Sequence, residues 1–557
     1  MALFRKKKGI EIDPDEIFVD SVNLPDFDDQ QFEGRIERSI PKGSVYFLVT
    51  AFGLVFSLFI WKAAALQVTN GEWYANRSSS NTLREIPVYG ERGLIVDRKD
   101  IELASNSPTR SYITDPGFAH VLGYVGYPTE QNLKDASHLS PEEYVGKAGV
   151  EKAFNDELRG VTGMKLVEVN AKGEVASENV YQPPLPGSTL HLSIDSKVQK
   201  KLFEIIKSVA DERGFSGGSG VIMDVHTGEI IAMTSYPEYN PEILSAGKDR
   251  EYISKTLNDS KNNPLLDRAI SGIYTPGSVV KPFMAVAALA EKVISPLKEI
   301  LSTGSISIQN PYDKTKKTVF KDWRAQGYVD MRHALAVSSD VYFYEIGGGF
   351  EGQKGLGIAN IEKYMKIFGF GEKTGIELDG EGEGVIPSPE WKAANFNGED
   401  WYIGDTYHTS IGQYGFGVTP LQMVRALSVI ANDGTLLTPT ILKQESSTTP
   451  VTNGRQLGID KSYYKVAREG MRLSVQEGTA KGLDIPQIEI GGKTGTAELG
   501  VSKGHVNSWV EGFWPYENPR YAFVVVMEHG VVHNTIGGVF VMRQFFDWLS
   551  VYGSEYY

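Results

Sequence analysis

An uncharged apolar segment near the N-terminus constrains the whole chain. Residues 44–61 (SVYFLVTAFGLVFSLFIW) contain no charged side chain, and Lys62 is followed by the apolar run 63–66. Because the stem of a lysine can lie along a membrane while its ammonium reaches water, the segment 44–66 is long enough to cross a bilayer as a helix. The sequence therefore predicts one membrane-spanning helix that separates a short N-terminal region from everything that follows.

Basic residues before this segment indicate its orientation. Arg35, Arg38 and Lys42 lie close to it, and the run 5–8 (RKKK) lies further upstream. By the positive-inside rule the N-terminus stays cytoplasmic and the residues after 66 are exported. A cleaved signal peptide and a buried helix of a soluble core are the alternatives. The length of the run and its distance from the N-terminus favour a retained anchor.

Composition excludes several classes of function. The formal net charge of −14 argues against nucleic-acid binding, which needs clustered lysine and arginine. Without cysteine, the chain has no disulfide, thiolate nucleophile or thiolate metal site. Its nine histidines include no His-Glu-x-x-His pattern, so a zinc hydrolase is not expected. No metal and no cofactor are predicted.

A chain of 557 residues is too long for one ordinary domain. We expect a cytoplasmic tail over 1–43, the membrane helix over 44–66, a small mainly β domain over 67–187 and a larger domain over 188–557. The proline-rich run 183–187 (PPLPG) marks the last boundary. The smaller domain should contain a short helix over Val150–Leu158. In the larger one a helix near 197–211, a hairpin around 226–228, late strands and a closing helix predict an α+β fold, an antiparallel sheet packed by helices.

The first of three chemical motifs is a Ser-x-x-Lys tetrad, Ser278 to Lys281, preceded by Pro276 and Gly277. Residues i and i+3 of a helix share a face, so Lys281 can reach Ser278 as the base that a serine nucleophile needs. Pro282 is tolerated only near the first turn of a helix. Ser278 is therefore expected at a helix start, where the dipole favours oxyanion charge and a neutral amine. Taken alone, the motif also fits a capping serine beside a solvated lysine.

The second motif is Ser338-Ser339-Asp340, which lies between two apolar runs. A helix end or loop there would present Ser338 toward the nucleophile as a proton relay. Asp340 would then orient Lys281 or the substrate amide. A pair of helix-capping residues is the alternative, since serine and aspartate are both favoured at that position.

The third motif is the run 491–496 (GGKTGT), which is typical of a strand whose glycines let a substrate backbone approach closely. Lys493 would contribute positive charge. Thr494 and Thr496 offer hydroxyls to a substrate carboxylate. The backbone N–H groups of Thr496 and Ser278 would form an oxyanion hole.

In this order the three motifs are the signature of penicillin-reactive acyl-serine enzymes. From about Pro87 onward the chain resembles the class B penicillin-binding proteins, which are membrane-anchored D,D-transpeptidases of peptidoglycan synthesis. Within that family it is most similar to the elongation-type group, penicillin-binding protein 2, because its second motif has the Ser-x-Asp form. Further matching segments are 92–98 (RGLIVDR), 103–106 (LASN), 120–126 (HVLGYVG), 149–151, 158–160, 404–406 and 419–422.

The resemblance implies a β-lactamase-like transpeptidase domain on a non-catalytic pedestal, in the bacterial cytoplasmic (inner) membrane. It implies two-step acyl transfer between peptidoglycan stem peptides, and acylation by β-lactams. It also implies partnership with a SEDS-type glycosyltransferase and elongation scaffold proteins. The catalytic residues would be Ser278, Lys281, Ser338, Asp340 and Lys493, and the substrate-binding residues Thr494, Gly495 and Thr496.

One departure from the elongation-type pattern concerns the pedestal. Members of that group carry a long insertion between the Leu-Ala-x-Asn stretch and the His-Val-x-Gly-Tyr-Val-Gly stretch. Here only residues 107–119 separate the two stretches. The head subdomain is therefore expected to be largely missing.

Two other functions share these motifs, and a third alternative belongs to another class of protein. A D,D-carboxypeptidase would pass the acyl group to water, and the anchor and pedestal argue weakly against it. A β-lactamase needs a deacylating base, for which Glu381, Glu383 and Glu390 are the candidates between the second and third motifs. A catalytically silent scaffold or β-lactam sensor is the third, and the intact motifs argue against the silent form.

Overall fold

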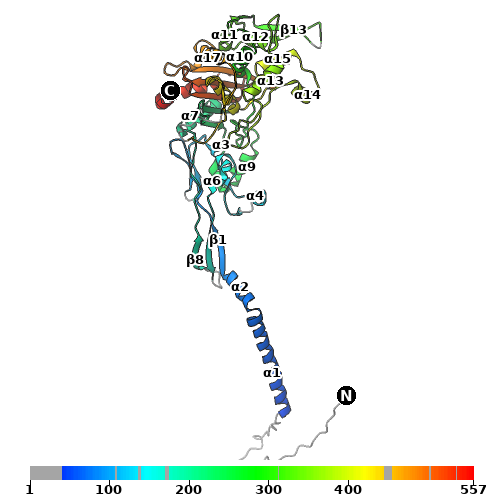
Figure 1. Ribbon diagram of the computed structural model, residues 1–557, viewed down its shortest axis with the longest axis vertical. Helices are drawn as coiled ribbons and strands as arrows, with labels where there is room; N and C mark the ends of the chain where they lie inside the picture. Colours follow the sequence, from blue (N-terminus) through cyan, green and yellow to red (C-terminus); the bar gives the residue numbers. More distant parts are fainter. Residues whose placement is uncertain are drawn as a thin grey trace, which may run out of the picture. The chain divides into compact units, whose positions relative to one another are not determined.

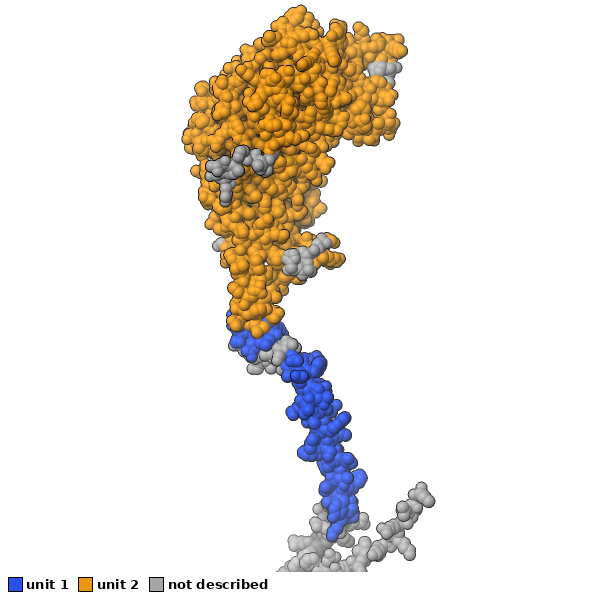
Figure 2. Space-filling model, in the orientation of Figure 1, with its two compact units in different colours: residues 1–84, 167–178 blue, residues 85–166, 179–557 orange. Residues whose placement is uncertain are grey.

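The computed structural model of the chain describes residues 41–106, 109–135, 139–169, 175–310, 313–444, 454–500, 504–532, 534 and 536–557. They fall into two compact units, the described residues of 1–84 and 167–178 and those of 85–166 and 179–557 (Figure 2). Of the predicted cytoplasmic tail, residues 1–40 lie outside the described residues. The domain limits predicted at 66 and 187 stay predictions.

One long apolar helix dominates the first unit. Helix α1 (Lys42–Ala64) continues into the short π-helix η3 (Ala65–Thr69), and α2 (Gly71–Thr82) follows (Figure 1). The 28 residues Lys42–Thr69 have a mean hydropathy of 2.1 in their most apolar stretch, and none of that stretch is buried. By length and composition this helix can cross a membrane, at the place the sequence predicts.

The smaller part of the second unit consists of short strands and helices. Strands β4, β3, β2 and β9 form a sheet in that order, and β5 pairs with β6. A further sheet, in the order β1-β7-β8, has strands that cross the limits between the two units. The bounds are β1 (Leu83–Val88), β2 (Ile95–Val96), β3 (Glu102–Asn106), β4 (Arg110–Tyr112), α3 (Ala119–Leu122), β5 (Val125–Gly126), α4 (Glu130–Asp135), β6 (Val145–Gly146), α5 (Gly149–Ala153), α6 (Asn155–Arg159), β7 (Gly163–Val169), β8 (Val175–Gln182) and β9 (Leu190–His191).

A buried carboxylate ties this region together. The two oxygens of Glu151, which is fully buried, accept hydrogen bonds of 2.5 Å each from the Nε atoms of Arg92 and Arg110. A buried charge is tolerated when it is paired and hydrogen-bonded in this way. The single helix expected over Val150–Leu158 is broken into α5 and α6, because Phe154 between them leaves the helical conformation.

The larger part is built on a five-stranded sheet in the order β11-β10-β20-β19-β18, in which all neighbours are antiparallel. Strands β10 (Gly217–Asp224) and β11 (Ile230–Tyr236) form the predicted hairpin. They pair with the late strands β18 (Gly491–Leu499), β19 (His505–Trp514) and β20 (Tyr521–Val531). Early and late segments thus share one antiparallel sheet, which agrees with the predicted α+β fold. Strand β18 lies at its edge.

Alternating side chains divide the core between the two faces of this sheet. On β10, Val221 and Met223 belong to one buried cluster and Ile222 to the other. Helices α7 (Ser196–Arg213) and α18 (Gly538–Tyr552) contribute to the cluster of Ile222, and α10 (Lys281–Ala290) and α16 (Pro420–Ala431) to the other. Such alternation is what a sheet covered on both faces needs. Figure 1 shows the helices packed around the orange and red strands.

The remaining helices, in chain order, are α8 (Pro241–Ala246), α9 (Arg250–Asn258), η4 (Gly277–Val280), α11 (Met331–Ala336), α12 (Asp340–Gly348), α13 (Ile358–Ile367), α14 (Pro389–Asn395), α15 (Ile403–Ser410), α17 (Lys461–Gln476), η5 (Lys481–Leu483) and η6 (Ser554–Tyr556). The remaining strands pair as β12 (Ile300–Ser302) with β15 (Gly327–Val329), β13 (Ser305–Gln309) with β14 (Lys317–Lys321), and β16 (Thr435–Leu437) with β17 (Gly454–Gln456).

Candidate active site

Ser278 lies in the short 3-10 turn η4, directly before helix α10. Lys281 is the first residue of α10 and Pro282 the second, so the proline occupies the first turn as its chemistry requires. The serine thus stands at a helix start, as predicted, although its own turn is 3-10 rather than α-helical. Among the described residues no hydrogen bond of the Ser278 hydroxyl is found.

Glycines bring strand β18 against this turn. A Cβ added at Gly495 would lie 2.8 Å from the carbonyl oxygen of Pro276, and one at Gly277 would lie 2.9 Å from that of Thr496. Gly277 also has a φ of +60°, a conformation that side chains disfavour. The first and third motifs therefore meet because glycine occupies both sides of the contact.

Ser338 joins the lysines of the other two motifs. Its Oγ accepts a hydrogen bond of 2.8 Å from Lys493 Nζ and a longer one of 3.4 Å from Lys281 Nζ. Lys281 Nζ also donates to the Ser338 carbonyl at 2.8 Å and to Asp340 Oδ1 at 2.6 Å. Because a hydroxyl oxygen has two lone pairs and one proton, Ser338 keeps its own proton available to donate. All three motifs are thus connected through one hydroxyl.

The backbone around Ser338 has a specialised conformation. Ser338 has a φ of 57° and lies between α11 and α12. Helix α12 is capped by Ser339, whose side chain accepts from the Tyr342 N–H. Capping is therefore done by the second serine of the motif, which leaves the first to face the lysines. A non-glycine residue with positive φ is strained, and such strain is often found at functional sites.

Burial controls the charges of the site. Lys281 and Lys493 are both fully buried, whereas the Asp340 side chain retains 19% of its exposure. Burial first, and then the nearby Lys281 cation, hold the pKa of Lys493 well below its usual range. The positive charge lies beneath the surface of the site rather than on it.

Asp322, which no sequence motif indicates, supports the second motif. Its Oδ2 accepts hydrogen bonds from Ser339 Oγ at 2.8 Å, from the Val341 N–H at 3.1 Å and from Ser302 Oγ at 3.1 Å. The ring N–H of Trp323, the next residue, donates to the Val337 carbonyl at 3.1 Å. This segment therefore fixes the loop that carries Ser338 and Asp340.

Replacing Asp322 by alanine is expected to lower the free energy of unfolding by about 3 kcal/mol, because buried donors lose their acceptor. The rate of Ser278 acylation should fall by about 10- to 100-fold as the second motif shifts. Chemical denaturation and labelling by fluorescent penicillin measure the two effects. Asp313→Ala, at an aspartate that bonds the neighbouring Thr315, is the matched control. Wild-type labelling kinetics in Asp322→Ala would contradict the supporting role.

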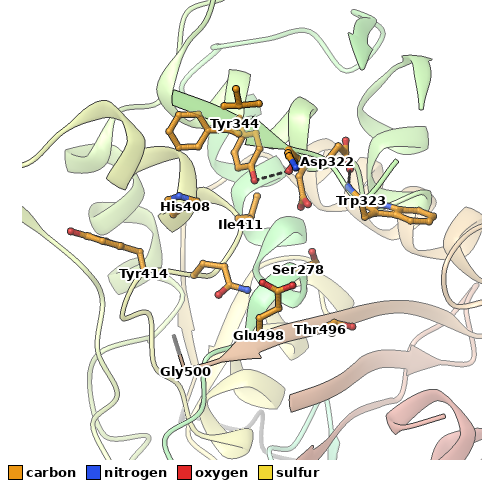
Figure 3. Close-up of a pocket in the computed structure, with 15 residues that line it drawn as sticks. Ser278, Asp322, Trp323, Tyr344, His408, Ile411, Tyr414, Thr496, Glu498 and Gly500 are labelled. Atoms are coloured by element: carbon orange, nitrogen blue, oxygen red, sulfur yellow. Dashed lines mark hydrogen bonds between the residues drawn. The ribbon is translucent and has the colours of Figure 1, made fainter. Parts of the chain in front are cut away.

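A pocket of about 760 Å³ opens over the serine. Ser278, Asp340 and Thr496 line it. Figure 3 shows Ser278 and Thr496 at this pocket. Glu498, two residues after Thr496 on β18, points into the same pocket and was not singled out from the sequence. The period of two along a strand is the signal by which it could have been found.

Some predicted residues lie beside the pocket rather than in it. The Thr494 hydroxyl donates to Thr479 Oγ1 at 2.7 Å, a partner that no motif indicates. Glu381, Glu383 and Glu390, the candidate deacylating residues, do not line the pocket. The Glu381 carboxylate instead accepts from Thr374 and from the Gly375 N–H.

Family comparison agrees with this geometry. The family model described as "Penicillin binding protein transpeptidase domain" matches residues 218–539, which include all three motifs. The chain belongs to the penicillin-binding protein transpeptidase family. A second family model, "Penicillin-binding Protein dimerisation domain", matches residues 103–192. The resemblance drawn from the motifs is thereby confirmed.

A curated relative in this family is named for its enzymatic activity. The chain is 34% identical over 448 residues to a protein of Acinetobacter baumannii named peptidoglycan D,D-transpeptidase MrdA, which covers 76% of this chain. The chain spans 63% of that relative's length.

Solved structures of the family share the fold. A complex of penicillin-binding protein 2 with MreC from Helicobacter pylori contains a chain that matches with a TM-score of 0.71 and 27% identity, over 85% of this chain and 99% of that one. A peptidoglycan synthase complex, described as coordinating polymerization and crosslinking, contains another, with a TM-score of 0.71 and 27% identity over 92% and 99%. The predicted fold class is thus confirmed.

Proposed function

We propose that the chain is a peptidoglycan D,D-transpeptidase that cross-links stem peptides during cell-wall elongation through an acyl ester on Ser278. The observation that carries this proposal is the buried hydrogen-bonded chain from Lys281 through Ser338 to Lys493, beneath a pocket that Ser278 lines. It supplies a base, a proton relay and a positive charge to one serine. The match of this protein to the transpeptidase family supports the same reaction.

In the first step Ser278 Oγ attacks the carbonyl carbon of the penultimate D-alanine and transfers its proton to a neutral Lys281 amine. A neutral amine still has two N–H groups, enough for its short bonds to Ser338 and Asp340, and its lone pair is then available. The backbone N–H groups of Ser278 and Thr496 stabilise the oxyanion. The helix start at α10 adds a favourable dipole.

In the second half of that step the C–N bond breaks. Ser338 donates its proton to the leaving D-alanine amine and regains one from Lys281, so that the proton taken from Ser278 leaves with the product. An amine of a neighbouring strand then attacks the ester, forms the new amide and returns a proton to Ser278 by the reverse route. No redox partner is needed, and every proton is accounted for.

Donor binding uses the edge of β18. An extended peptide can align with a free strand edge, and Thr496 presents its hydroxyl there, beside Thr494 and Gly495. Lys493 is fully buried, so we assign it two tasks: attracting the terminal carboxylate through its charge, and holding Ser338. β-Lactams enter the same pocket and acylate Ser278.

We also propose where this protein lies in the cell and which proteins it assembles with. The apolar helix Lys42–Thr69 anchors the chain in the bacterial cytoplasmic membrane with its N-terminus inside and the domain of the sheet outside. Relatives have been solved in complex with MreC and in a peptidoglycan synthase assembly. A SEDS-type glycosyltransferase and an elongation scaffold protein are accordingly the partners we propose here.

Water is the competing acceptor, and Glu498 in the pocket is the residue that would favour it. The test supplies the full-length protein in detergent with a D-alanyl-D-alanine stem peptide and an amine acceptor, and analyses products by mass spectrometry. We expect cross-linked peptide with one D-alanine released per link. Predominant hydrolysis of the donor peptide would show that the protein is a D,D-carboxypeptidase instead. Rapid turnover of penicillin would show that it is a β-lactamase.

A further inference from the structure

A glutamate lies where the core beneath the site should be apolar. Glu511 on β19 is directly opposite Lys493 on β18 in the antiparallel register, and both residues are fully buried. Opposed residues of an antiparallel pair project from the same face, with Cβ atoms about 4.5–5.5 Å apart. The Glu511 carboxylate therefore lies on the face from which Lys493 reaches Ser338.

The surroundings of this carboxylate offer it no hydrogen bond. Neither oxygen of Glu511 has a hydrogen-bond partner among the described residues, although both are buried. The next residues on the same face, Trp509 and Phe513, belong to the apolar core. Burying a carboxylate without hydrogen bonds costs free energy of folding, and such a group is retained where a nearby opposite charge offsets that cost. Glu511 is thus a buried ionisable residue between two apolar ones on its face of the strand.

Lys493 is the charge that Glu511 faces. Burial raises the pKa of Glu511 well above its usual range, and the Lys493 cation opposes that rise. For Lys493, burial and Lys281 lower the pKa, while Glu511 and Asp340 raise it. The site therefore contains two lysines and two carboxylates. Asp340 forms a direct pair with Lys281 at 2.6 Å, which leaves Glu511 as the counter-charge of Lys493.

We propose that Glu511 is a positioning residue of this site, which keeps Lys493 protonated so that its ammonium holds the Ser338 hydroxyl. The proposal rests on the proposed acyl-transfer function. Glu511 is fully buried and does not line the pocket, so it does not touch the reacting atoms. It acts through the hydrogen bond of 2.8 Å between Lys493 Nζ and Ser338 Oγ.

The sign of the effect follows from the charges. Replacing Glu511 by a neutral residue removes an influence that raises the pKa of Lys493, so the lysine loses its proton at a lower pH. Acylation that depends on the Lys493 cation then fails on the alkaline side first. An opposite charge within about 4–6 Å shifts a pKa by about 1–3 units, so we expect the alkaline limb of the pH profile to move down by about one pH unit or more.

The test measures the second-order rate of Ser278 labelling by fluorescent penicillin between pH 5.5 and 10 in the full-length protein. Glu511→Gln and Glu511→Leu are two neutral variants, of which at least one should fold. Glu511→Asp keeps the charge. Glu489→Gln removes an exposed carboxylate that pairs with Arg472 and serves as the matched control. Thermal unfolding of each variant separates folding from chemistry.

We expect both neutral variants to lose labelling at a pH about one unit lower than the wild type. Glu511→Asp keeps the negative charge and should therefore stay close to the wild-type profile. Glu489→Gln should follow the wild-type profile. Profiles that superpose for all variants, with only the thermal midpoints changed, would reduce Glu511 to a structural residue and overturn the inference. Absence of labelling in the wild type would instead refute the proposed function, so the two failures are distinguishable.

Discussion

Alanine at position 278 is expected to abolish both cross-linking and labelling by fluorescent penicillin. Loss of the nucleophile of a serine acyl-transfer enzyme costs about 10⁶ in rate, so the remaining activity should be at background. Neither Lys281 nor Ser338 can replace the missing nucleophile, because both are buried and neither lines the pocket. Product analysis and gel fluorescence measure the two losses.

The same variant should fold normally. Ser278 is partly exposed and its hydroxyl has no hydrogen bond among the described residues, so the free energy of unfolding should change by less than about 0.5 kcal/mol. Ser271→Ala, at another partly exposed serine that does not line the pocket, is the control and should retain full activity. Cross-linking by folded Ser278→Ala at more than a few per cent of the wild-type rate would refute the assigned nucleophile.

Methionine at position 281 is expected to slow acylation of Ser278 by about 10²- to 10⁴-fold, the usual contribution of a general base. Methionine keeps the length and the apolar stem of Lys281, which is fully buried with its ammonium 5.4 Å from the centre of the Phe343 ring. The variant therefore removes the base while preserving most of the packing. Stopped-flow or quench-flow labelling gives the rate constant.

Arginine at the same position separates base chemistry from simple charge. A guanidinium retains the positive charge beside Asp340 but does not give up its proton in proteins. Lys281→Arg should therefore be as slow as Lys281→Met. If arginine restored acylation to within tenfold of the wild type, Lys281 would be an electrostatic residue rather than the base.

The sequence predicted the elements whose signals are local. The helix expected near 197–211 is α7, and Asp195 caps it by accepting hydrogen bonds from the N–H groups of Lys197 and Val198. Pro282 placed Ser278 at a helix start, because a proline inside a helix is excluded beyond the first turn. These inferences needed only neighbouring residues. The roles given to the motif residues follow from chemistry and stay predictions.

Residues whose importance depends on distant partners were not predictable in this way. Asp322 lies 17 positions before Ser339 in the chain, and no spacing rule connects the two. Thr479 meets Thr494 only once α17 and β18 have packed. Glu511 faces Lys493 through a strand register that the sequence alone does not fix. The break at Phe154 likewise divides a helix that its composition would have allowed.

Acylation of the full-length protein by fluorescent penicillin, followed over time and mapped by mass spectrometry of its peptides, tests the acyl-serine claim most directly. We expect one stable adduct, on the peptide that contains Ser278, which persists for much longer than it takes to form. Folded protein that forms no adduct, or that carries the adduct on another residue, would contradict it.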